Sequence, residues 1–529
     1  MKYPIGIQDF EQIIQNGYVY VDKTQLVYRL VTEGKIYFLS RPRRFGKSLL
    51  VSTLKYYFQG RKDLFQGLAI ESLEKEWAEY PVFHIDFNGG VFTRAGELDE
   101  MLEDTVKSWE EKYECGGEFR NLGKRFAHVL SQARKRYGRR CVVLVDEYDK
   151  PILDVLDTES VVHRDGRDWQ LEDWNREVLR GFYSVFKAAD PDLQFVLLTG
   201  VTKFSQVSVF SGFNQPSDIS MDEDYEALCG ITQEELEHYF PDSIRELAKV
   251  NQYTEAEAME QLKLRYDGYH FSCQMTDVYN PFSLLNAFAK RRLRDYWFST
   301  GTPNYLVRLL GHTHEDLDEL TGRYYDPREF VDYRADVERP LPMIYQSGYL
   351  TIKAYDRDFG TFLLDFPNNE VKGGFVSLVA SGYLKPAENL DSWIRSAVIA
   401  MRKGDVDRLR QLFTSFLAGI PYSMRRKSDE RERERYFHYT FYLIFRLISV
   451  YTVYTEREQS QGRVDCTVET PDYLYVFEFK LDGTANEALR QIEEKGYARS
   501  YEGDRQKLYK IGVSFSSETG TVEEWKVGD

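Results

Sequence analysis

The apolar positions along the first 200 residues predict strands that alternate with helices. Lys35–Ser40 is a short β-rich run, and after a basic loop Leu50 and Leu54 begin an apolar pattern at helical spacing. Cys141–Val145 and Phe195–Leu198 are continuous apolar runs, which are typical of strands buried in a parallel sheet. We also expect a strand over Tyr80–Phe87 and helices over 97–113, 121–136 and 173–189. Such alternation implies βαβ crossovers, so this part is predicted to be one α/β domain with a parallel sheet.

After about residue 215 the pattern becomes helical, and it changes again near the C-terminus. Helical stretches at Thr232–Tyr239, Thr254–Tyr266 and Ser283–Ala289 are separated by turns rich in Asp, Gly and Pro. Short β-like pieces at Tyr349–Ala354 and Thr361–Phe366 precede further helices, and a run of charge over 425–435 marks a boundary. We therefore predict an α/β domain over 1–215, a helical, lid-like accessory region over 216–335, a connecting α/β region over 336–420 and a C-terminal domain over 421–529.

Composition and charge narrow the class of protein. With 529 residues, 42% of them apolar and 29% charged, the chain has the balance of a globular protein rather than a disordered one. The net charge of −16 gives no global attraction to nucleic acid, so any polyanion must be met locally. Five scattered cysteines without a C-x-x-C pair suggest neither disulfides nor a cysteine zinc site, and they fit a reducing cytoplasm.

No membrane anchor is expected from the sequence. The N-terminal residues lack the apolar core of a signal peptide. The most apolar long stretch, Tyr442–Tyr454, is too short to span a bilayer and contains Arg446.

A phosphate-binding loop is predicted where the first strand meets its helix. Gly46-Lys47-Ser48 stands at that junction, where exposed backbone N–H groups and the helix dipole favour an anion. Gly46 permits the tight turn, Lys47 is expected to reach the β- and γ-phosphates, and the Ser48 hydroxyl is expected to bind Mg²⁺. The flanking Arg44, Phe45 and Leu49 complete the predicted ATP-binding segment. The first glycine of the usual eight-residue pattern is replaced by Arg41, so the match is degenerate.

Two acids that follow the apolar run Cys141–Val145 complete a predicted ATPase site. Asp146 and Glu147 follow Val142–Val145 directly, at the edge where ligands bind in open α/β sheets. We expect Asp146 to hold Mg²⁺ and Glu147 to polarise the water that attacks the γ-phosphate. Thr199, at the end of the neighbouring apolar strand, is a candidate for sensing that phosphate.

A β-hairpin near the C-terminus carries a second constellation. Pro471-Asp472 is a good two-residue turn between two β-rich runs, and this turn places Asp465 directly opposite Glu478. Lys480 shares the face of Glu478, because side chains alternate along a strand. Two facing carboxylates repel unless a cation joins them, and oxygen ligands suit Mg²⁺ or Mn²⁺. The pattern therefore predicts a catalytic metal site on Asp465 and Glu478, with Lys480 orienting the attacking water or stabilising a phosphodiester charge.

Plainer explanations stay open for each group. Gly46–Ser48 can be a simple helix start, and Asp146 with Glu147 a solvated strand end. The hairpin acids can be exposed positions. Among the flanking residues, Arg41, Arg43 and Arg44 either add charge at the phosphates or pair with surface acids, Asp22 and Lys23 either line the nucleotide site or form an ion pair, and Gln491 and Tyr497 either contact substrate or support packing.

Several blocks together resemble a known family. They are Ile5–Phe10, Tyr20–Thr24, Arg41–Ser48 (RPRRFGKS), Asp146–Pro151 (DEYDKP), Phe210–Asn214 and Tyr279–Leu284. Over nearly the whole chain they resemble the AAA-ATPase-like proteins fused to a C-terminal PD-(D/E)xK nuclease-superfamily domain, which are abundant in Bacteroidetes and other anaerobes. In that group RPRRFGKS is the normal form of the loop.

The resemblance implies roles beyond those read from spacing. It assigns Asp465, Glu478 and Lys480 to the PD-(D/E)xK core and matches Gln491 to a glutamine frequent on the following helix. The acid common on the first helix of that superfamily has only Glu432 and Glu434 as candidates. It also suggests ATP-controlled processing of nucleic acid, with mobile-element or phage defence as a context. Because AAA relatives often form rings, a homo-oligomer is allowed.

Three functional hypotheses follow. The favoured one is an ATPase whose nucleotide state governs a metal-dependent nuclease. The second is a nucleotide-dependent switch whose C-terminal domain binds nucleic acid or a partner without cleaving. The third keeps the nuclease on a scaffold that binds ATP but does not hydrolyse it. The sequence leaves the kind of nucleic acid open, with Arg425, Arg426, Lys427 and Arg490 as candidates for a local basic groove.

Overall fold

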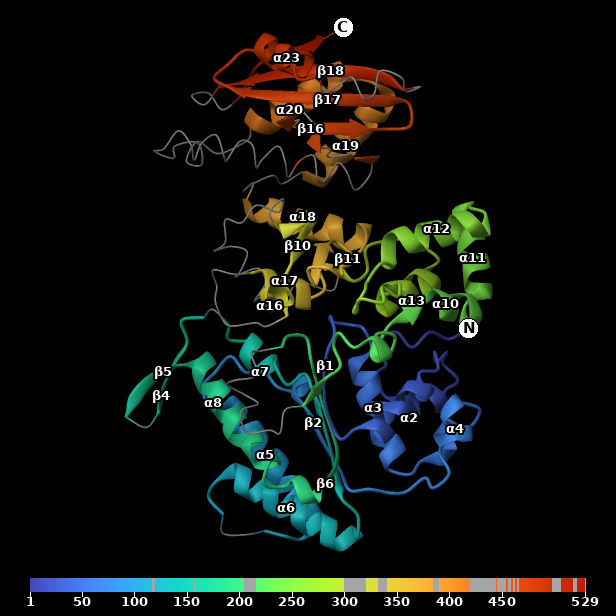
Figure 1. The fold of residues 1–529 in the computed structure, drawn as a ribbon, viewed down its shortest axis with the longest axis vertical. Helices are drawn as coiled ribbons and strands as arrows, with labels where there is room; N and C mark the ends of the chain where they lie inside the picture. The colour runs from blue at the N-terminus through green and yellow to red at the C-terminus, as the bar shows by residue number, and fades with distance from the viewer. Residues whose placement is uncertain are drawn as a thin grey trace. The chain divides into compact units, whose positions relative to one another are not determined.

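The chain folds into two compact units, Met1–Val371 and Lys372–Asp529 (Figure 1). The computed structural model describes residues 1–116, 119–156, 158–164, 166–203, 216–298, 320–331, 340–383, 390–418, 466–496, 506–516 and 521–528, with Ile444 and the pairs 453–454, 458–459 and 462–463. The predicted charged run at 425–435 and the block Phe210–Asn214 lie outside these residues.

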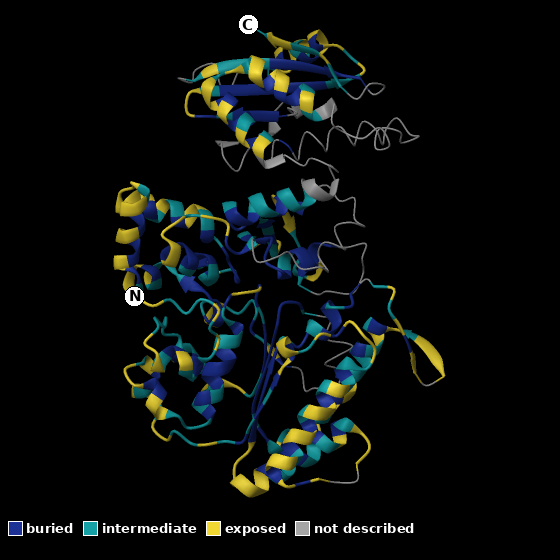
Figure 2. Ribbon diagram, turned by 180° about the vertical axis from the view of Figure 1, so that it is seen from behind, coloured by how far each residue is buried: buried dark blue, intermediate teal, exposed yellow. Residues whose placement is uncertain are grey.

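A five-stranded sheet forms the centre of the first unit. Its spatial order is β2-β3-β6-β1-β7, and every neighbouring pair is parallel. The strands are β1 (Ile36–Ser40), β2 (Val82–Asp86), β3 (Cys141–Asp146), β6 (Leu193–Gly200) and β7 (Ser217–Asp218). All six residues of β3 are buried, and the sheet runs as a dark band through the unit in Figure 2. The predicted α/β architecture with a parallel sheet is therefore confirmed.

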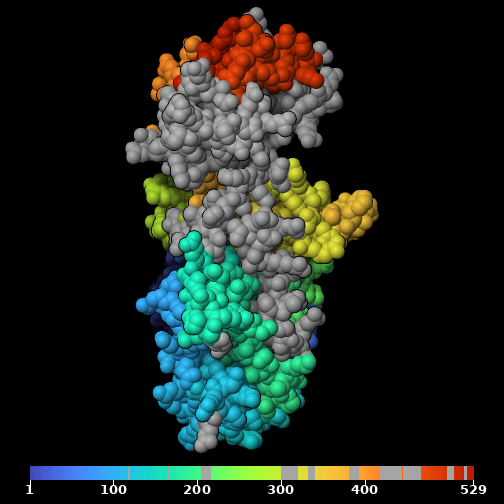
Figure 3. All heavy atoms as spheres, turned by 90° about the vertical axis from the view of Figure 1, so that its left-hand side faces the viewer, coloured from blue at the N-terminus to red at the C-terminus, as the bar shows by residue number. Residues whose placement is uncertain are grey.

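Helices cover both faces of this sheet. One group is α1 (Phe10–Gln15), α2 (Thr24–Glu33), α3 (Lys47–Phe58) and α4 (Ala69–Leu73), and the other is α5 (Glu97–Tyr113), α6 (Leu122–Tyr137) and α8 (Leu171–Tyr183) (Figure 1). Trp109 of α5 stacks on Phe126 of α6 at 5.1 Å between ring centroids, and Phe83 of β2 packs edge-on against Trp109. In the space-filling view, α5 and α6 (light blue to teal) form an outer surface of this unit (Figure 3).

Smaller elements connect these layers. They are α7 (Lys150–Leu153), the hairpin β4 (Val161–Arg164) and β5 (Arg167–Gln170), and the 3₁₀ turns Lys62–Phe65, Phe87–Gly89, Ser184–Phe186, Asp190–Asp192 and Glu223–Tyr225. The helix expected over 173–189 ends at Tyr183, because the chain continues as the 3₁₀ turn Ser184–Phe186.

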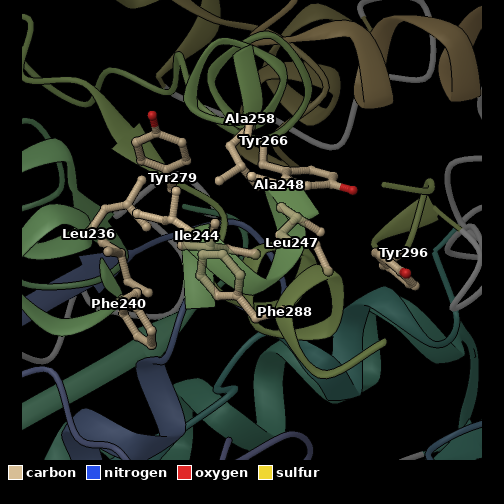
Figure 4. Close-up of a cluster of buried hydrophobic side chains, with 14 residues drawn as sticks. Leu236, Phe240, Ile244, Leu247, Ala248, Ala258, Tyr266, Tyr279, Phe288 and Tyr296 are labelled. Carbon is tan, nitrogen blue, oxygen red and sulfur yellow. The ribbon is translucent and has the colours of Figure 1, made fainter. Parts of the chain in front are cut away.

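The helical region of the first unit follows the predicted pattern closely. It contains β8 (Ile231–Thr232), α10 (Gln233–Tyr239), α11 (Pro241–Asn251), α12 (Glu255–Tyr266), β9 (Val278–Tyr279) and α13 (Pro281–Lys290). Thr232 with Glu235, and Thr254 with Glu257, form capping boxes that fix where α10 and α12 begin. Leu236, Phe240, Leu247 and Phe288 meet in its core (Figure 4).

The first unit ends in a small antiparallel sheet. Its order is β10-β12-β11, from β10 (Arg323–Tyr325), β11 (Thr351–Asp356) and β12 (Thr361–Asp365), with α16 (Pro327–Phe330) and α17 (Leu341–Gln346) between β10 and β11 along the chain. Helix α18 (Asn369–Tyr383) begins in this unit, and its sequence continues into the second.

The second unit is built on a mixed five-stranded sheet of order β13-β16-β17-β18-β19. The long central strands β17 and β18 are parallel, whereas the other pairs are antiparallel. Its elements are α19 (Leu390–Lys403), α20 (Val406–Ala418), β13 (Val453–Tyr454), β14 (Glu458–Gln459), β15 (Gly462–Arg463), β16 (Cys466–Glu469), β17 (Tyr473–Leu481), α23 (Ala485–Glu494), β18 (Lys507–Phe515) and β19 (Val522–Gly528). The predicted small mixed-sheet domain is thereby confirmed.

Candidate functional site

The loop between β1 and α3 has the geometry of an anion cradle. Gly46 caps α3 with a left-handed φ of +95°, which glycine adopts without steric cost, and Arg44 is also left-handed at +65°. The side chain of Lys47 is buried and donates hydrogen bonds from Nζ to the carbonyl oxygens of Arg41 and Pro42, at 3.0 and 3.1 Å. The ammonium group of Lys47 thus lies against the backbone of the loop that is expected to bind phosphates.

Arg41 takes neither of the two roles considered from the sequence. Its side chain is 1% exposed and donates from Nη1 to the carbonyl oxygens of Ser40 and Ser220, at 2.9 and 2.7 Å. The guanidinium lies 4.1 Å from the ring centroid of Phe271, and its burial lowers the pKa of Arg41. At the position of the missing first glycine, the arginine therefore ties the loop to the protein interior.

The neighbouring residues divide between anchoring the loop and lining it. Phe45 is fully buried, 4.8 Å from Tyr269 between ring centroids, and its carbonyl accepts the N–H of Gly230. Arg44 is exposed and lies over the ring of Phe282 at 4.1 Å. Ser48 and Leu49, half-buried in the first turn of α3, line the adjoining cavity.

The predicted acids and Thr199 come together at the ends of β3 and β6. Asp146 is 2% exposed, and its Oδ1 accepts hydrogen bonds from Thr199 Oγ1 at 2.6 Å and from the N–H of Glu147 at 3.1 Å. Glu147 has a left-handed φ of +50°, a strained conformation for a residue with a side chain. Burial raises the pKa of Glu147, against the opposing charge of Lys47. These acids are not solvated strand ends.

One cavity of about 420 Å³ joins the loop to Glu147. This volume lies within the usual range for a small-molecule site, roughly 300–1,000 Å³. Lys47, Ser48 and Glu147 line it, together with residues that sequence reasoning did not single out for this site: Pro4–Gln8, Asn88, Lys150, Phe282, Trp297 and Tyr349. Some of these wall residues lie in the blocks that carry the resemblance, Ile5–Phe10, Asp146–Pro151 and Tyr279–Leu284.

A smaller apolar cavity of about 100 Å³ shares Gly46 and Leu49 with the larger one. Val19, Val21 and Leu285 contribute to its wall, as does Lys23. Lys23 forms an ion pair with Glu235 at 2.6 Å, so of the two roles considered for this lysine the structure shows the ion pair. Asp22 accepts the N–H of Thr24 at 2.8 Å and stabilises the start of α2.

The C-terminal hairpin has the predicted register. Cys466 pairs with Phe477 and Glu469 with Leu474, and the N–H of Thr470 donates to the carbonyl of Tyr473 across Pro471-Asp472. Glu478 is 1% exposed, which excludes the solvated-face explanation for this residue. Asp465 lies outside the described residues, as do Glu432, Glu434, Tyr497 and Arg425–Lys427.

Three side chains meet on one face of this sheet. Lys480 Nζ donates to Gln491 Oε1 at 2.6 Å and lies 3.2 Å from Glu478 Oε1. Gln491 belongs to α23. A capping box of Thr484 and Glu487 marks the start of this helix, and Ile492 packs it against Val476 of β17. Arg490 instead forms an exposed pair with Glu494 at 3.5 Å.

Carboxylate and hydroxyl oxygens are the ligands that Mg²⁺ prefers, and both sites supply them. Ser48 and Asp146 offer such oxygens at the first site, and buried Glu478 offers them at the second. Within the described ranges, no three His, Cys, Asp or Glu side chains are grouped closely enough to form a metal site by themselves.

Among the helices of the described ranges, none has the length and apolar character that crossing a bilayer demands.

Comparisons with known proteins agree with this geometry. Residues 4–210 match the family model described as predicted AAA-ATPase, and residues 432–525 match that of the PD-(D/E)XK nuclease superfamily. A relative from Azotobacter chroococcum mcd 1, described as "Uncharacterized protein in vnfD 5'region", is 36% identical over 532 residues, which cover 98% of each chain. The chain therefore belongs to the family of AAA-ATPase-like proteins that carry a C-terminal PD-(D/E)XK nuclease-superfamily domain.

Proposed function

We propose that the protein binds and hydrolyses ATP and thereby controls a metal-dependent phosphodiester hydrolase in its C-terminal unit. The observation that carries the nuclease part is the hydrogen-bonded set of buried Glu478, Lys480 and Gln491 on a hairpin of the predicted register. The ATPase part rests on the cavity that Lys47, Ser48 and Glu147 share.

At the nucleotide site, each side chain has a defined task. The N–H groups at the start of α3 hold phosphate oxygens, with Arg44, Phe45 and Gly46 shaping the loop. Lys47 leaves the carbonyl oxygens of Arg41 and Pro42 to bind the β- and γ-phosphates. When bound at Ser48 and Asp146, Mg²⁺ neutralises phosphate charge. We assign the adenine base of ATP to the apolar cavity that Leu49 lines.

Hydrolysis is assigned to Glu147 and its neighbours. Glu147 polarises the attacking water, and its raised pKa favours this role because a stronger base takes up a proton more readily. The 2.6 Å hydrogen bond from Thr199 supports a role in orienting Asp146, through which Thr199 senses the γ-phosphate.

At the nuclease site, the observed pairing of Cys466 with Phe477 supports our proposal that the next pair is Asp465 with Glu478. We assign both carboxylates to Mg²⁺ or Mn²⁺, which when bound acts as a Lewis acid on the phosphodiester. Lys480 orients the attacking water and Gln491 holds Lys480 in place. The substrate is nucleic acid.

The wider assignments are also proposals. The four parts 1–215, 216–335, 336–420 and 421–529 act as ATPase domain, lid, connection and nuclease. The cytoplasm is the proposed location, which is supported by five cysteines that form no disulfide with one another. Defence against mobile elements or phages is the proposed context, and the ATPase domains work as a homo-oligomer.

One observation favours a second candidate, a nucleotide switch with a non-cleaving C-terminal domain. Lys480 and Glu478 form an ion pair at 3.2 Å, and such a pair can be purely structural. Lys480→Ala separates these two functions, and Glu147→Gln tests ATP hydrolysis. Glu147→Gln is expected to bind ATP but not to hydrolyse it, and Lys480→Ala is expected to abolish cleavage. If the wild-type protein cleaves no nucleic acid with Mg²⁺ or Mn²⁺, the switch is the better account.

A further inference from the structure

The turn at the end of β6, residues 200–202, is bonded to the phosphate loop on one side. The N–H of Arg41 donates to the carbonyl of Gly200 at 3.2 Å, and the hydroxyl of Ser40 donates to the carbonyl of Val201 at 2.6 Å. Two hydrogen bonds therefore tie the start of the loop to this turn.

On its other side, the same turn is held by Asp149. Oδ2 of Asp149 accepts hydrogen bonds from the N–H of Val201 at 2.9 Å and from the N–H and hydroxyl of Thr202, at 2.6 and 2.8 Å. Asp149 is 1% exposed, so at Oδ2 these three donors take the place of water. One buried side chain thus fixes two consecutive backbone N–H groups.

Tyr148 strengthens the junction. Its N–H donates to the carbonyl of Thr199 at 3.0 Å, and its hydroxyl donates to the carbonyl of Thr202 at 2.9 Å. A Cβ atom at Gly200 would come within 2.7 Å of the Tyr148 ring and 2.8 Å of Asp149 Oδ1, so only glycine permits this approach. Tyr148 and Asp149 are therefore closely packed against the end of β6 at Gly200.

The strained residue Glu147 lies between these fixed points. Asp146 precedes it and is bonded to Thr199, whereas Tyr148 and Asp149 follow it and are bonded to residues 199–202. A left-handed φ at a non-glycine residue persists only where its surroundings determine it. Removing the bonds of Asp149 frees one end of this segment.

We propose that Asp149 is a positioning residue for ATP hydrolysis, which sets the distance between Glu147 and the phosphate loop by clamping the turn at 200–202. The inference rests on the proposed ATPase function. It goes further by giving a task to a residue that touches neither the nucleotide nor the attacking water. Substituting Asp149 is expected to slow turnover while nucleotide binding persists.

The test compares Asp149→Asn and Asp149→Ala with the wild-type full-length protein. Asparagine keeps the shape but puts an NH₂ group or a neutral oxygen where a carboxylate accepts three bonds, and alanine removes all three. A matched control is Asp192→Asn, at the opposite end of β6, where Asp192 pairs with Arg134 at 2.9 Å. We expect kcat to fall about tenfold in Asp149→Asn and about a hundredfold in Asp149→Ala, since small displacements of catalytic groups have effects of that size. The KM for ATP is expected to stay within about threefold of the wild-type value.

Hydrogen–deuterium exchange gives a readout that does not depend on activity. In Asp149→Asn and Asp149→Ala, amide exchange is expected to be faster at the turn 200–202 and at the loop from Arg41 to Lys47. In Asp192→Asn it is expected to stay at the wild-type rate. Unchanged kcat, or faster exchange confined to 200–202 with the loop unaffected, overturns the proposal. If the wild-type protein hydrolyses no ATP, the proposed function fails, whereas the exchange pattern still decides whether Asp149 holds the loop.

Discussion

The hydroxyl of Thr199 donates a 2.6 Å hydrogen bond to Oδ1 of Asp146. Because Val145 pairs with Leu198 in the parallel sheet, these two residues leave neighbouring strands at the same level. A group expected to sense the γ-phosphate is thus attached to the carboxylate expected to serve Mg²⁺. A change at one is transmitted directly to the other.

Replacing Thr199 with valine keeps its shape and removes this hydrogen bond. Asp146 is then left with the N–H of Glu147 as its remaining described donor, so we expect a loss of about 1–3 kcal/mol in the free energy of unfolding and a lower kcat. Denaturant unfolding and steady-state ATPase assays measure both. Thr199→Ser keeps the hydroxyl and is expected to retain most of the activity. Wild-type turnover in Thr199→Val would remove Thr199 from the mechanism.

Lys47→Ala is expected to weaken ATP binding by about ten- to a hundredfold, because it removes a charged donor to the phosphates. Lys55→Ala is the matched control, since Lys55 lies in the last turn of the same helix, α3. Titration with a fluorescent ATP analogue measures the two affinities. Equal affinities of Lys47→Ala and the wild type would show that the loop is not a phosphate cradle.

The sequence predicted those features that depend on local pattern. The apolar runs at Cys141–Val145 and Phe195–Leu198 became central parallel strands because continuous burial leaves no other arrangement in an α/β domain. The hairpin register followed from Pro471-Asp472, because a two-residue turn fixes which residues pair. The residues next to this turn therefore paired as predicted.

Features that depend on distant contacts could not be predicted. Arg41 turns inward because Ser220 and Phe271, far along the chain, supply a carbonyl and a ring. Trp297 and Tyr349 join the wall of the large cavity for the same kind of reason. The position of Asp465 stays a prediction.

Glu370 gives a pH dependence with a defined sign. Burial raises its pKa from 4.5 to about 8, and its Oε1 accepts the N–H of Trp297 at 2.7 Å. Between about pH 4.5 and about pH 8 the unfolded chain has released this proton while the folded chain retains it, so rising pH destabilises the fold. Glu370→Gln cannot ionise and is expected to gain stability relative to wild type, by up to about 1.4 kcal/mol per pH unit. Unfolding at pH 5, 6, 7 and 8 tests this, and a difference that does not change with pH contradicts it.

Divalent metal is expected to stabilise the C-terminal unit through Glu478. Without nucleotide, Mn²⁺ at a hundred times its Kd adds about 2.7 kcal/mol to a folded state that alone binds it. Glu478→Gln should lose this effect, whereas Glu493→Gln, an exposed position on α23 that pairs with Lys510, should keep it. Thermal unfolding with Mn²⁺ and with EDTA provides the measurement. An equal gain in Glu478→Gln would place the metal elsewhere.

The most direct test of an ATP-controlled nuclease is cleavage of a panel of single- and double-stranded DNA and RNA in Mg²⁺ or Mn²⁺, with and without ATP. The panel is run with wild-type protein, Lys480→Ala, Lys47→Ala and the control Lys507→Ala, which removes an exposed lysine at the start of β18. We predict cleavage that Lys480→Ala abolishes, that Lys507→Ala retains, and that responds to ATP only while Lys47 is present. Cleavage that persists in Lys480→Ala, or that ignores ATP and the Lys47→Ala change, would contradict the account.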